Sequence, residues 1–339
     1  MNNNTDDMKE DRHTHDVRPC IYCGKDSAET LFTYTYDFLL HTRGLSPEKL
    51  QARGWDENTT SSIVKCRHCG CNYVRDIFII YEQDSTKPLD EHERAELIEK
   101  YAKPITFEQA NYLRYCRALA DTLLRHFSKR TEKRSLSLLD FGSSLSSFSL
   151  TARACGFHPV VLYDRYFRPN IEGVVSKQHP LDFHFIRDQQ ELRALAPFDV
   201  MTCQAAVEHF YDPQSELQLM HELLSDDGIL FITNPCEPLN KKSELLKREG
   251  AITKSEMRRF LKKNYHLQHV NFPSPKQFSN MLARAGFQEK TTFLFYPFLD
   301  VPALGAMNIL RMVKACLLFV LDLLKIPHKK KTAYFVVKR

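Results

Sequence analysis

Two cysteine pairs with the same spacing carry the clearest chemistry in this chain. Each pair has two residues between its thiols and a glycine directly after it, and the four cysteines are Cys20, Cys23, Cys66 and Cys69. Two intervening residues let both sulfurs of a pair face one ion, and glycine permits the tight turn that follows. Two such pairs complete a tetrahedral four-thiolate zinc site with no open position for water or substrate. The spacing therefore predicts a structural zinc ion rather than a catalytic one.

The ligand set has alternatives. His68 and Cys71 stand beside the second pair as spare ligands, and a thioredoxin-like redox motif is the other interpretation of such a pair. The remaining cysteines fall in apolar runs and are expected to be small core residues: Cys116, Cys155, Cys203, Cys236 and Cys316. The first residues contain no apolar run of a secretory signal, so we expect reduced thiols and a cytoplasmic location.

A strand, a loop of small residues and a helix follow one another between residues 136 and 156. The strand ends near Asp140, the loop contains Gly142 and Ser144, and the next strand ends on Asp164. Small residues let a ligand approach the backbone, and an acid at the end of the second strand can accept hydrogen bonds from both ribose hydroxyls. The pattern predicts a nucleoside-binding site, and a βαβ unit without a ligand is the alternative.

Further motifs follow in order along the chain. FDVMTC at 198–203 leads into VEHFYDP at 207–213, LLSDDGILFI at 223–232 precedes Asn234-Pro235, and HVNF at 269–272 precedes SPKQ and then AGF at 285–287. In order and spacing these segments resemble class I S-adenosylmethionine-dependent methyltransferases over about residues 105–300. With a zinc-knuckle segment in front, the chain is also similar to the deoxysugar C-methyltransferases of polysaccharide and natural-product clusters. The combination of motifs carries the resemblance, since no single one is specific.

The resemblance implies S-adenosylmethionine as the cofactor and suggests the residues that bind it. Asp140 and Gly142 would lie at its methionine end, and Asp164 would lie on its ribose hydroxyls. Asp188 would lie near the adenine amino group, and Gln204, just after the fourth strand, would line the pocket.

The glycine loop departs from the pattern of the family, which is usually D-x-G-x-G-x-G. Ser144 and Ser146 replace the second and third glycines, and Ser144 is still expected to be one of the cofactor-binding residues of this loop. Serine at a left-handed position costs on the order of 1 kcal/mol, and it can also cap the following helix. A degenerate, non-catalytic copy of the fold is therefore an alternative.

Three residues are candidates for catalysis. The methyl carbon on a sulfonium is electrophilic, so the protein mainly aligns donor and acceptor and, where needed, removes a proton. Glu208 and His209 follow the fourth strand, and His209 is a candidate general base because imidazole titrates near neutrality. Alternatively, this pair shapes the loop before Asp212 and Pro213 cap the next helix. His269, which the resemblance places beside the pocket, is the third candidate, and an ordinary strand-edge histidine is its alternative.

Short apolar runs alternate with helical segments from residue 136 onward. Seven runs read as strands: SLSLLDF, PVVLYD, DFHFI, FDVMTC, GILFITN, a segment near TTFLFY, and AYFVV. Strands alternating with helices favour parallel pairing. We therefore expect an α/β fold with a doubly wound, seven-stranded, mostly parallel sheet, Rossmann-like as in the methyltransferases, and a small N-terminal zinc-binding segment. Ligands of such sheets bind outside the carboxyl ends of the strands.

The domain organisation follows from these elements. A capping box of Thr106 and Gln109, with apolar residues behind it at helical spacing, predicts an amphipathic helix over 107–127. We expect a disordered leader at 1–17, a zinc-knuckle segment at 18–80, a linker with helices at 81–130, and a cofactor-binding methyltransferase domain at 131–339 with a helical insertion at about 303–326.

Composition and charge narrow the class of partner. The 339 residues are 43% hydrophobic and 26% charged with only 11 Gly, which excludes fibrous and wholly disordered proteins. Residues 241–263 hold nine Lys/Arg against three acids, which suits either a basic lid over an anionic substrate or a solvated helical face.

The apolar stretch 303–326 contains charges that argue against a membrane span, and a Lys-rich cluster follows it. We favour a helix hairpin over the substrate cleft there, with peripheral contact to an anionic membrane as the alternative.

Together these patterns predict an S-adenosylmethionine-dependent methyltransferase acting on a small or carrier-linked anionic metabolite, with a nucleotide sugar as the leading candidate. The rival functions are an RNA methyltransferase whose zinc segment binds RNA and a non-catalytic binding protein that keeps the fold. Residues 18–80 carry no dense Lys/Arg run, so we rank the nucleic-acid partner second.

Overall fold

The computed structural model describes residues 18–36, 47–51, 56–75, 90–92, 94–95, 107–127, 135–143, 147–165, 183–234, 269–290, 317, 320, 324 and 333–339. The chain divides into two compact units. Within the described residues, the first unit comprises 18–36, 47–51, 56–75, 208–214 and 269–277, and the second comprises the rest. The first unit is therefore assembled from segments that lie far apart in the sequence.

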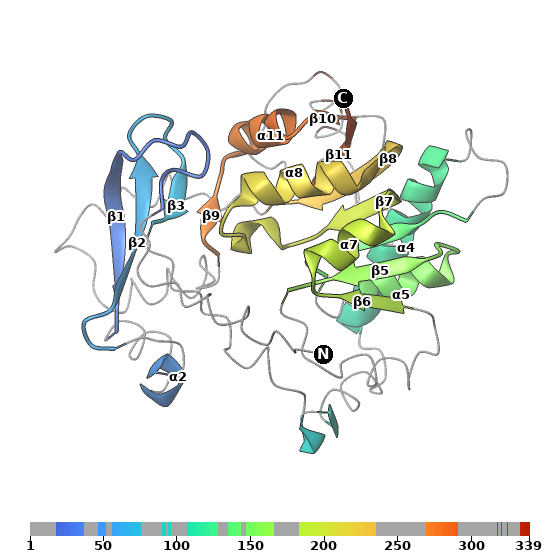
Figure 1. Cartoon of the computed structure of the whole chain (residues 1–339), viewed down its shortest axis with the longest axis horizontal. Helices are drawn as coiled ribbons and strands as arrows, with labels where there is room; N and C mark the ends of the chain where they lie inside the picture. Colours follow the sequence, from blue (N-terminus) through green and yellow to red (C-terminus); the bar gives the residue numbers. More distant parts are fainter. Residues whose placement is uncertain are drawn as a thin grey trace, which may run out of the picture. The chain divides into compact units, whose positions relative to one another are not determined.

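A seven-stranded sheet forms the second unit, in the order β10-β11-β8-β7-β4-β5-β6 (Figure 1). Its strands are β4 (Leu138–Phe141), β5 (Val160–Tyr163), β6 (Phe183–Ile186), β7 (Phe198–Cys203), β8 (Leu224–Thr233), β10 (Phe287–Glu289) and β11 (Ala333–Lys338). The pairs among β4 to β8 are parallel, whereas β11 runs antiparallel to both β8 and β10. The doubly wound, mostly parallel sheet expected from the sequence is confirmed.

The sixth strand lies slightly earlier than its apolar run indicated. β10 occupies Phe287–Glu289, directly before the segment near TTFLFY, and that segment lies outside the described residues. β10 pairs with the last strand, with Phe287 opposite Lys338.

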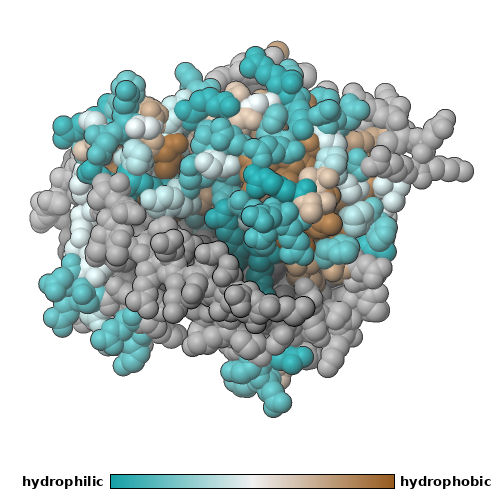
Figure 2. Space-filling model, in the orientation of Figure 1, coloured by the Kyte–Doolittle hydropathy of each residue, from teal (hydrophilic) through white to brown (hydrophobic). Residues whose placement is uncertain are grey.

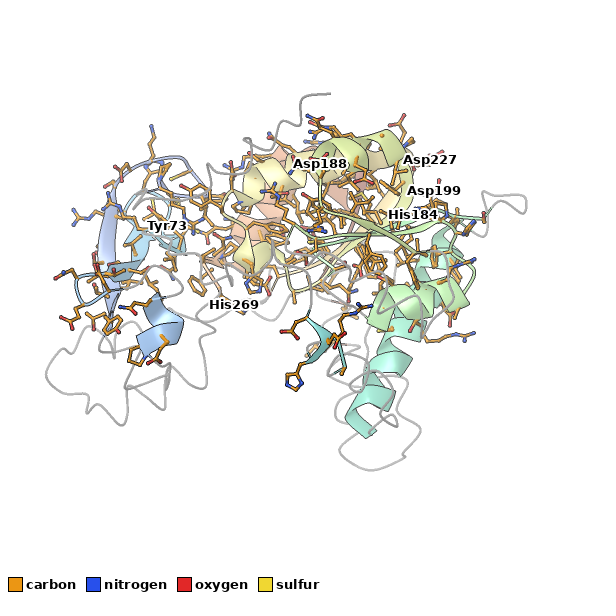
Figure 3. The ribbon with its side chains drawn as sticks, turned by 60° about the horizontal axis from the view of Figure 1, so that its bottom comes forward. Tyr73, His184, Asp188, Asp199, Asp227 and His269 are labelled. Carbon is orange, nitrogen blue, oxygen red and sulfur yellow. The ribbon has the colours of Figure 1, made fainter. Side chains whose placement is uncertain are left out.

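The strand order reverses beside β4. The chain moves outward from β4 to β5 and β6, and β7 then returns to the other side of β4. Such a reversal opens a crevice at the carboxyl ends of the two central strands. At the amino ends of the same two strands, Asp199 of β7 binds the residue before β4. Its carboxylate accepts hydrogen bonds from both the backbone N–H and the hydroxyl of Ser137, each at 3.0 Å (Figure 3).

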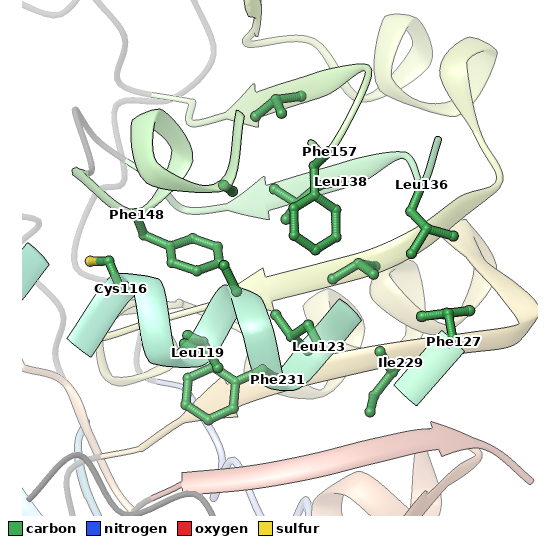
Figure 4. Close-up of a cluster of buried hydrophobic side chains, with 14 of the residues drawn as sticks. Cys116, Leu119, Leu123, Phe127, Leu136, Leu138, Phe148, Phe157, Ile229 and Phe231 are labelled. Atoms are coloured by element: carbon green, nitrogen blue, oxygen red, sulfur yellow. The ribbon is translucent and has the colours of Figure 1, made fainter. Parts of the chain in front are cut away.

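Helices cover both faces of the sheet. Side chains of α4 (Phe107–Phe127) and α5 (Ser147–Ala154) pack on one face (Figure 4). The buried residues there include Leu119, Leu123, Phe148, Phe157 and Phe231. Alternate strand residues point to the other face, where Tyr334 of β11 meets Phe278 of α11 (Pro275–Arg284). The described part of this unit also contains α7 (Gln189–Leu195) and most of α8 (Pro213–Leu223), and an ion pair of Arg193 with Glu222 at 2.9 Å links these two helices.

The helix α4 begins at Phe107 and ends at Phe127, as the capping box and the helical spacing predicted. Its residues Leu119, Ala120, Leu123 and Phe127 are almost completely buried, while Arg117 and Asp121 are exposed. One apolar stripe facing the sheet and one polar face toward solvent account for the amphipathic pattern.

A four-stranded antiparallel sheet forms the first unit, in the order β1-β2-β3-β9. Its strands are β1 (Ala28–Thr35), β2 (Thr60–Cys66), β3 (Asn72–Val74) and β9 (Asn271–Phe272), and the unit also contains the short helix α2 (Pro47–Gln51). β9 comes from a segment about 200 residues after β3, and Asn72 pairs with Phe272.

Three segments named in the sequence analysis lie wholly or mostly outside the described residues. They are the leader 1–17, the basic segment 241–263 and the insertion 303–326, of which three residues are described. Among the residues that the structure describes, no helix has the length and apolar character needed to cross a bilayer. The coloured surface drawn in Figure 2 is mostly hydrophilic, with smaller hydrophobic areas.

Candidate active site and metal centre

The predicted cofactor residues of the second unit lie directly after three neighbouring parallel strands. Gly142 follows β4, Asp164 follows β5 and Gln204 follows β7. Because β4 pairs in parallel with both β5 and β7, these residues share the edge of the sheet where the strand order reverses. Such edges are the ligand-binding edges of doubly wound folds.

Gly142 occupies a backbone conformation that favours glycine. Its φ is 67°, and its N–H donates to the carbonyl of Tyr163 at 2.8 Å, which ties the loop to the end of β5. A side chain at this φ would cost about 1 kcal/mol. The positive φ therefore explains why glycine stands at the first position of the glycine pattern. The other two positions, Ser144 and Ser146, lie outside the described residues.

Asp140 carries a buried carboxylate that links three elements of the second unit. Its side chain is only 2% exposed, and its two carboxylate oxygens accept hydrogen bonds from Ser149 at 2.7 Å and from Thr202 at 2.6 Å. The carboxylate thereby connects β4, the start of α5 and β7. Its hydroxyl donors were not identified from the sequence, because they stand 9 and 62 residues away from it.

The two other acids differ in surroundings. Asp164 is partly buried at the carboxyl end of β5, and its backbone N–H donates to Ile186 at 3.1 Å. Asp188 is the N-cap of α7, where one carboxylate oxygen accepts from the backbone N–H groups of Gln190 at 2.7 Å and Glu191 at 2.9 Å (Figure 3). The structure thus gives Asp188 a capping role that the sequence analysis did not foresee.

The loop after β7 contains a strained residue. Ala205, next to Gln204, has a φ of 52°, and its N–H donates to the hydroxyl of Thr233 at 2.9 Å. A left-handed alanine costs roughly 1 kcal/mol, and such strain gathers at functional loops. No pattern in the sequence signalled this conformation.

Glu208, His209 and His269 come together in the first unit. Glu208 and His209 belong to the 3-10 turn η2 (Val207–His209), and the N–H of Val270 donates to the carbonyl of Glu208 at 2.7 Å. This backbone contact brings Nε2 of His269 to 3.9 Å from a carboxylate oxygen of Glu208. The two imidazole rings meet edge to face, with 4.9 Å between centroids. Residues 60 positions apart in the chain therefore form one cluster.

The loop that carries this cluster also caps a helix, as the alternative interpretation expected. Asp212 accepts a hydrogen bond from the backbone N–H of Gln214 at 3.0 Å, and Pro213 begins α8. Proline is favoured at the first helical position because its missing N–H would have no partner inside the helix. Cap formation and the cluster involve different residues, so the two interpretations are compatible.

Arg18 holds the segments of the first unit together. Its guanidinium donates to the carbonyls of Val74 at 2.7 Å, Tyr211 at 2.6 Å and Val270 at 2.6 Å. It also lies over the rings of Tyr73 and Tyr211, 5.6 and 5.8 Å from their centroids. Burial lowers the pKa of Arg18 to about 10, so the group remains charged at neutral pH. The sequence analysis missed this residue, because nothing local indicates its three acceptors.

The four predicted cysteines form one cluster in the first unit. Sγ of Cys20 lies 3.5 Å from Sγ of Cys69, and Sγ of Cys23 lies 3.6 Å from Sγ of Cys66. Sulfurs on a regular tetrahedron around one zinc ion would be about 3.8 Å apart, given Zn–S bonds of ~2.3 Å. The donor set and spacing therefore fit a single tetrahedral ion.

Both glycines after the pairs make the predicted turns. Gly24 and Gly70 have φ angles of 69° and 70°. The N–H of Gly24 donates to the carbonyl of Cys20 at 2.8 Å, and that of Gly70 donates to Cys66 at 2.9 Å. The two knuckles thus share one backbone geometry, and glycine supplies the positive φ that it requires.

Cys71 lies beside the cluster as a fifth, completely buried sulfur. A hydrogen bond from Cys71 lowers the pKa of Cys20 to about 4, whereas burial raises the pKa of Cys23 and of Cys69 above the ordinary range. The hydrogen bond to Cys20 raises the pKa of Cys71 itself. The thiol of Cys71 donates a hydrogen bond to the backbone carbonyl of Asn72 at 3.7 Å, and neither Cys71 nor the other spare ligand, His68, belongs to the described cluster of potential metal ligands.

Gln277 connects a knuckle to the start of α11. Its side chain and Ser274 form a reciprocal capping box, with Ser274 N–H to the Gln277 carbonyl oxygen at 2.9 Å and Gln277 N–H to the Ser274 hydroxyl at 3.4 Å. The amide nitrogen of Gln277 also donates to the carbonyl of Cys69 at 3.0 Å. The metal-binding segment and the segment that carries His269 are thereby joined.

Comparison with known families gives one match. A family model described as a methyltransferase domain matches residues 110–290. This range contains β4 to β8 and the edge of the sheet that carries Gly142, Asp164 and Gln204, and it also contains the Glu208 cluster. No curated protein matches the chain.

Several solved structures are similar to the chain. One is an S-adenosylmethionine-dependent methyltransferase from Mesorhizobium loti, with 14% identity, a TM-score of 0.36, and coverage of 63% of this chain and 94% of that one. Another is the plantazolicin methyltransferase BpumL in complex with SAH, with 15% identity, a TM-score of 0.39, and coverage of 76% and 93%. The magnesium protoporphyrin IX methyltransferase from Synechocystis PCC 6803 with bound SAH shows 14% identity, a TM-score of 0.39, and coverage of 59% and 84%.

Proposed function

The chain belongs to the methyltransferase-domain family and is an S-adenosylmethionine-dependent methyltransferase, and we propose that its acceptor is a small or carrier-linked anionic metabolite, with a nucleotide sugar as the leading candidate. The observation that supports the cofactor site is the grouping of Gly142, Asp164 and Gln204 after three adjacent parallel strands. The anionic character of the acceptor is supported by the nine basic residues in 241–263, which lie outside the described residues. A cytoplasmic location is part of the proposal.

S-adenosylmethionine supplies an electrophilic methyl group that is bound to a positively charged sulfur. When an electron pair of the acceptor forms the new bond to the methyl carbon, the sulfur leaves as a neutral thioether. Asp164 would accept hydrogen bonds from the ribose hydroxyls, and Gly142 would let the cofactor approach the backbone at the methionine end. Asp140 would hold that loop through Ser149 and Thr202. Asp188 would face the adenine amino group with the carboxylate oxygen that does not cap α7.

The cluster of Glu208, His209 and His269 would receive the acceptor's proton. The chain passes from Gln204, at the carboxyl end of β7, to Glu208 within four residues. His209 is the candidate base, Glu208 would stabilise the imidazolium that results, and His269 would orient the pair. Only an acceptor that carries a proton on its reacting atom has to lose one. Whether His209 acts as a general base therefore depends on the acceptor.

The four thiolates of Cys20, Cys23, Cys66 and Cys69 would hold a structural zinc ion. Four protein ligands leave no open coordination position, so the ion would take no direct part in methyl transfer. Its contribution would be folding free energy for a small unit. Through Gln277 and β9 it would also stabilise the segment that carries His269.

A transfer assay tests the acceptor class. The full chain is incubated with S-adenosylmethionine labelled in the methyl group, together with nucleotide sugars in one series and RNA in another. We expect label in the nucleotide-sugar fraction, and we expect Glu208→Gln and His209→Asn to lower kcat by about 100-fold or more. His184→Ala, an exposed histidine of β6, is the matched control and should retain full activity. Label in RNA alone would contradict the proposed acceptor and favour the RNA methyltransferase.

A further inference from the structure

Glu208, His209 and His269 have the composition of a metal site. Each side chain offers one ligand atom, and these atoms all lie within 4.8 Å of one another. Two imidazoles and one carboxylate are a recurrent ligand set for zinc and for iron(II), in which three protein ligands leave positions open. The set differs from the four thiolates, which close the coordination sphere.

The spacing of the atoms suits an ion better than a direct hydrogen bond. Nε2 of His269 and the nearest oxygen of Glu208 are 3.9 Å apart, beyond the 2.7–3.2 Å of an N–H···O hydrogen bond. Two ligand atoms that bind one tetrahedral ion at ~2.1 Å lie about 3.4 Å apart. The separation of 3.9 Å is about 0.5 Å longer than that, a difference that rotation about side-chain bonds can close.

The cluster is buried and its backbone is held in place. The side chains of Glu208 and His269 are only 2% and 11% exposed. The Val270 to Glu208 hydrogen bond fixes the two segments, and the side-chain amide of Asn271 donates to the carbonyl of Phe210 at 2.6 Å beside it.

We propose that Glu208, His209 and His269 bind one divalent first-row transition-metal ion, most simply zinc, in a second metal site with open coordination positions. Whether the ion binds does not depend on the proposed methyl transfer. Its role in catalysis rests on the proposed methyltransferase function. With an ion in place, the cluster would lower the pKa of an acceptor hydroxyl, and the proton of that hydroxyl would pass to solvent water instead of to the His209 ring as the oxygen takes the methyl group. Metal content therefore distinguishes two ways in which one cluster can act.

The test counts metal ions in the full chain. Protein purified without chelators is analysed by inductively coupled plasma mass spectrometry, and we expect two ions per chain. Glu208→Gln and His269→Ala should each leave one ion, that of the four-thiolate cluster. His184→Ala is the control and should keep two. Titration of partly stripped protein with Co²⁺ should show a second binding event without thiolate charge-transfer absorption, weakened at least about 100-fold in both cluster variants.

The outcomes separate the metal site from the proposed function. One ion per chain in the wild type, and no second Co²⁺ event, would overturn the inference. Two ions that persist in Glu208→Gln and His269→Ala would place the second ion elsewhere and overturn it as well. Calorimetric binding of S-adenosylhomocysteine to the same samples reports on the cofactor site alone, so its loss would contradict the methyltransferase function without bearing on the ion. Far-UV circular dichroism identifies a variant that has unfolded, and Glu208→Gln preserves side-chain shape.

Discussion

The buried carboxylate of Asp140 allows a sharp test of how β4 and β7 are held together beside the proposed cofactor loop. Replacing Thr202 by valine keeps the shape of the side chain and removes the hydroxyl that donates to Asp140 at 2.6 Å. A hydrogen bond to a charged group contributes about 1.5–3 kcal/mol when it is buried. Because Asp140 is only 2% exposed, water cannot easily replace the lost donor. We expect Thr202→Val to destabilise β4 and β7 by about 2 kcal/mol.

Thr122→Val is the matched control. Thr122 is also buried, but its hydroxyl donates to the neutral carbonyl of Ala118 within α4 at 2.7 Å and accepts a hydrogen bond from the exposed side chain of Arg125 at 3.0 Å. Losing the bond to the neutral carbonyl costs about 0.5–1.5 kcal/mol, and water can replace Thr122 as the partner of the exposed Arg125. Native-state hydrogen exchange measured by mass spectrometry gives the free energy of opening for the amides of β4. If Thr202→Val changes this free energy no more than Thr122→Val does, the carboxylate of Asp140 does not link β4 and β7 as described.

Three further predictions concern the cofactor loop, the metal cluster and pH. Gly142→Ala should cost about 1 kcal/mol at a φ of 67° and should weaken S-adenosylhomocysteine binding, as calorimetry measures; unchanged binding would show that the cofactor does not approach this backbone. Cys66→Ser should release the ion of the thiolate cluster and lower the melting temperature, whereas Cys155→Ser, outside the cluster, should keep the ion; equal metal content in both variants would contradict the assignment. Burial lowers the pKa of His221 below 6.5, so the unfolded chain binds a proton more readily, and stability should fall as pH drops from about 6.5 through the folded pKa. His221→Gln should flatten this part of the pH dependence of the melting temperature, and an equally steep profile in the variant would refute the role of His221.

Local patterns predicted the elements whose causes are local. The helix at 107–127 was predicted to the residue because its sequence carries a capping-box pattern at the start and apolar residues at helical spacing, which form one buried stripe. The five parallel strands are short apolar runs because helices bury both faces of the sheet. The thiolate cluster was predictable because ligand spacing and the two positive-φ glycines repeat in both knuckles.

Features that depend on distant partners could not be read from the sequence. β9 is two residues long and joins a sheet whose other strands lie about 200 residues earlier, so no periodicity marks it. Arg18 stands among ordinary polar residues, and its importance arises from three backbone carbonyls in separate segments. The sequence named the Glu208-His209 pair and His269 as separate candidates, and only the structure, through the Val270 to Glu208 contact, shows that they form one cluster.

Calorimetric binding of S-adenosylhomocysteine to the full chain tests the central claim most directly. The account predicts micromolar binding that Asp164→Ala abolishes and that Asp227→Asn, an exposed acid at the start of β8, leaves unchanged. Absence of binding up to millimolar ligand, in protein that is folded and retains the metal of its thiolate cluster, would contradict the account. It would identify the chain as a methyltransferase fold whose serine-substituted loop no longer holds the cofactor.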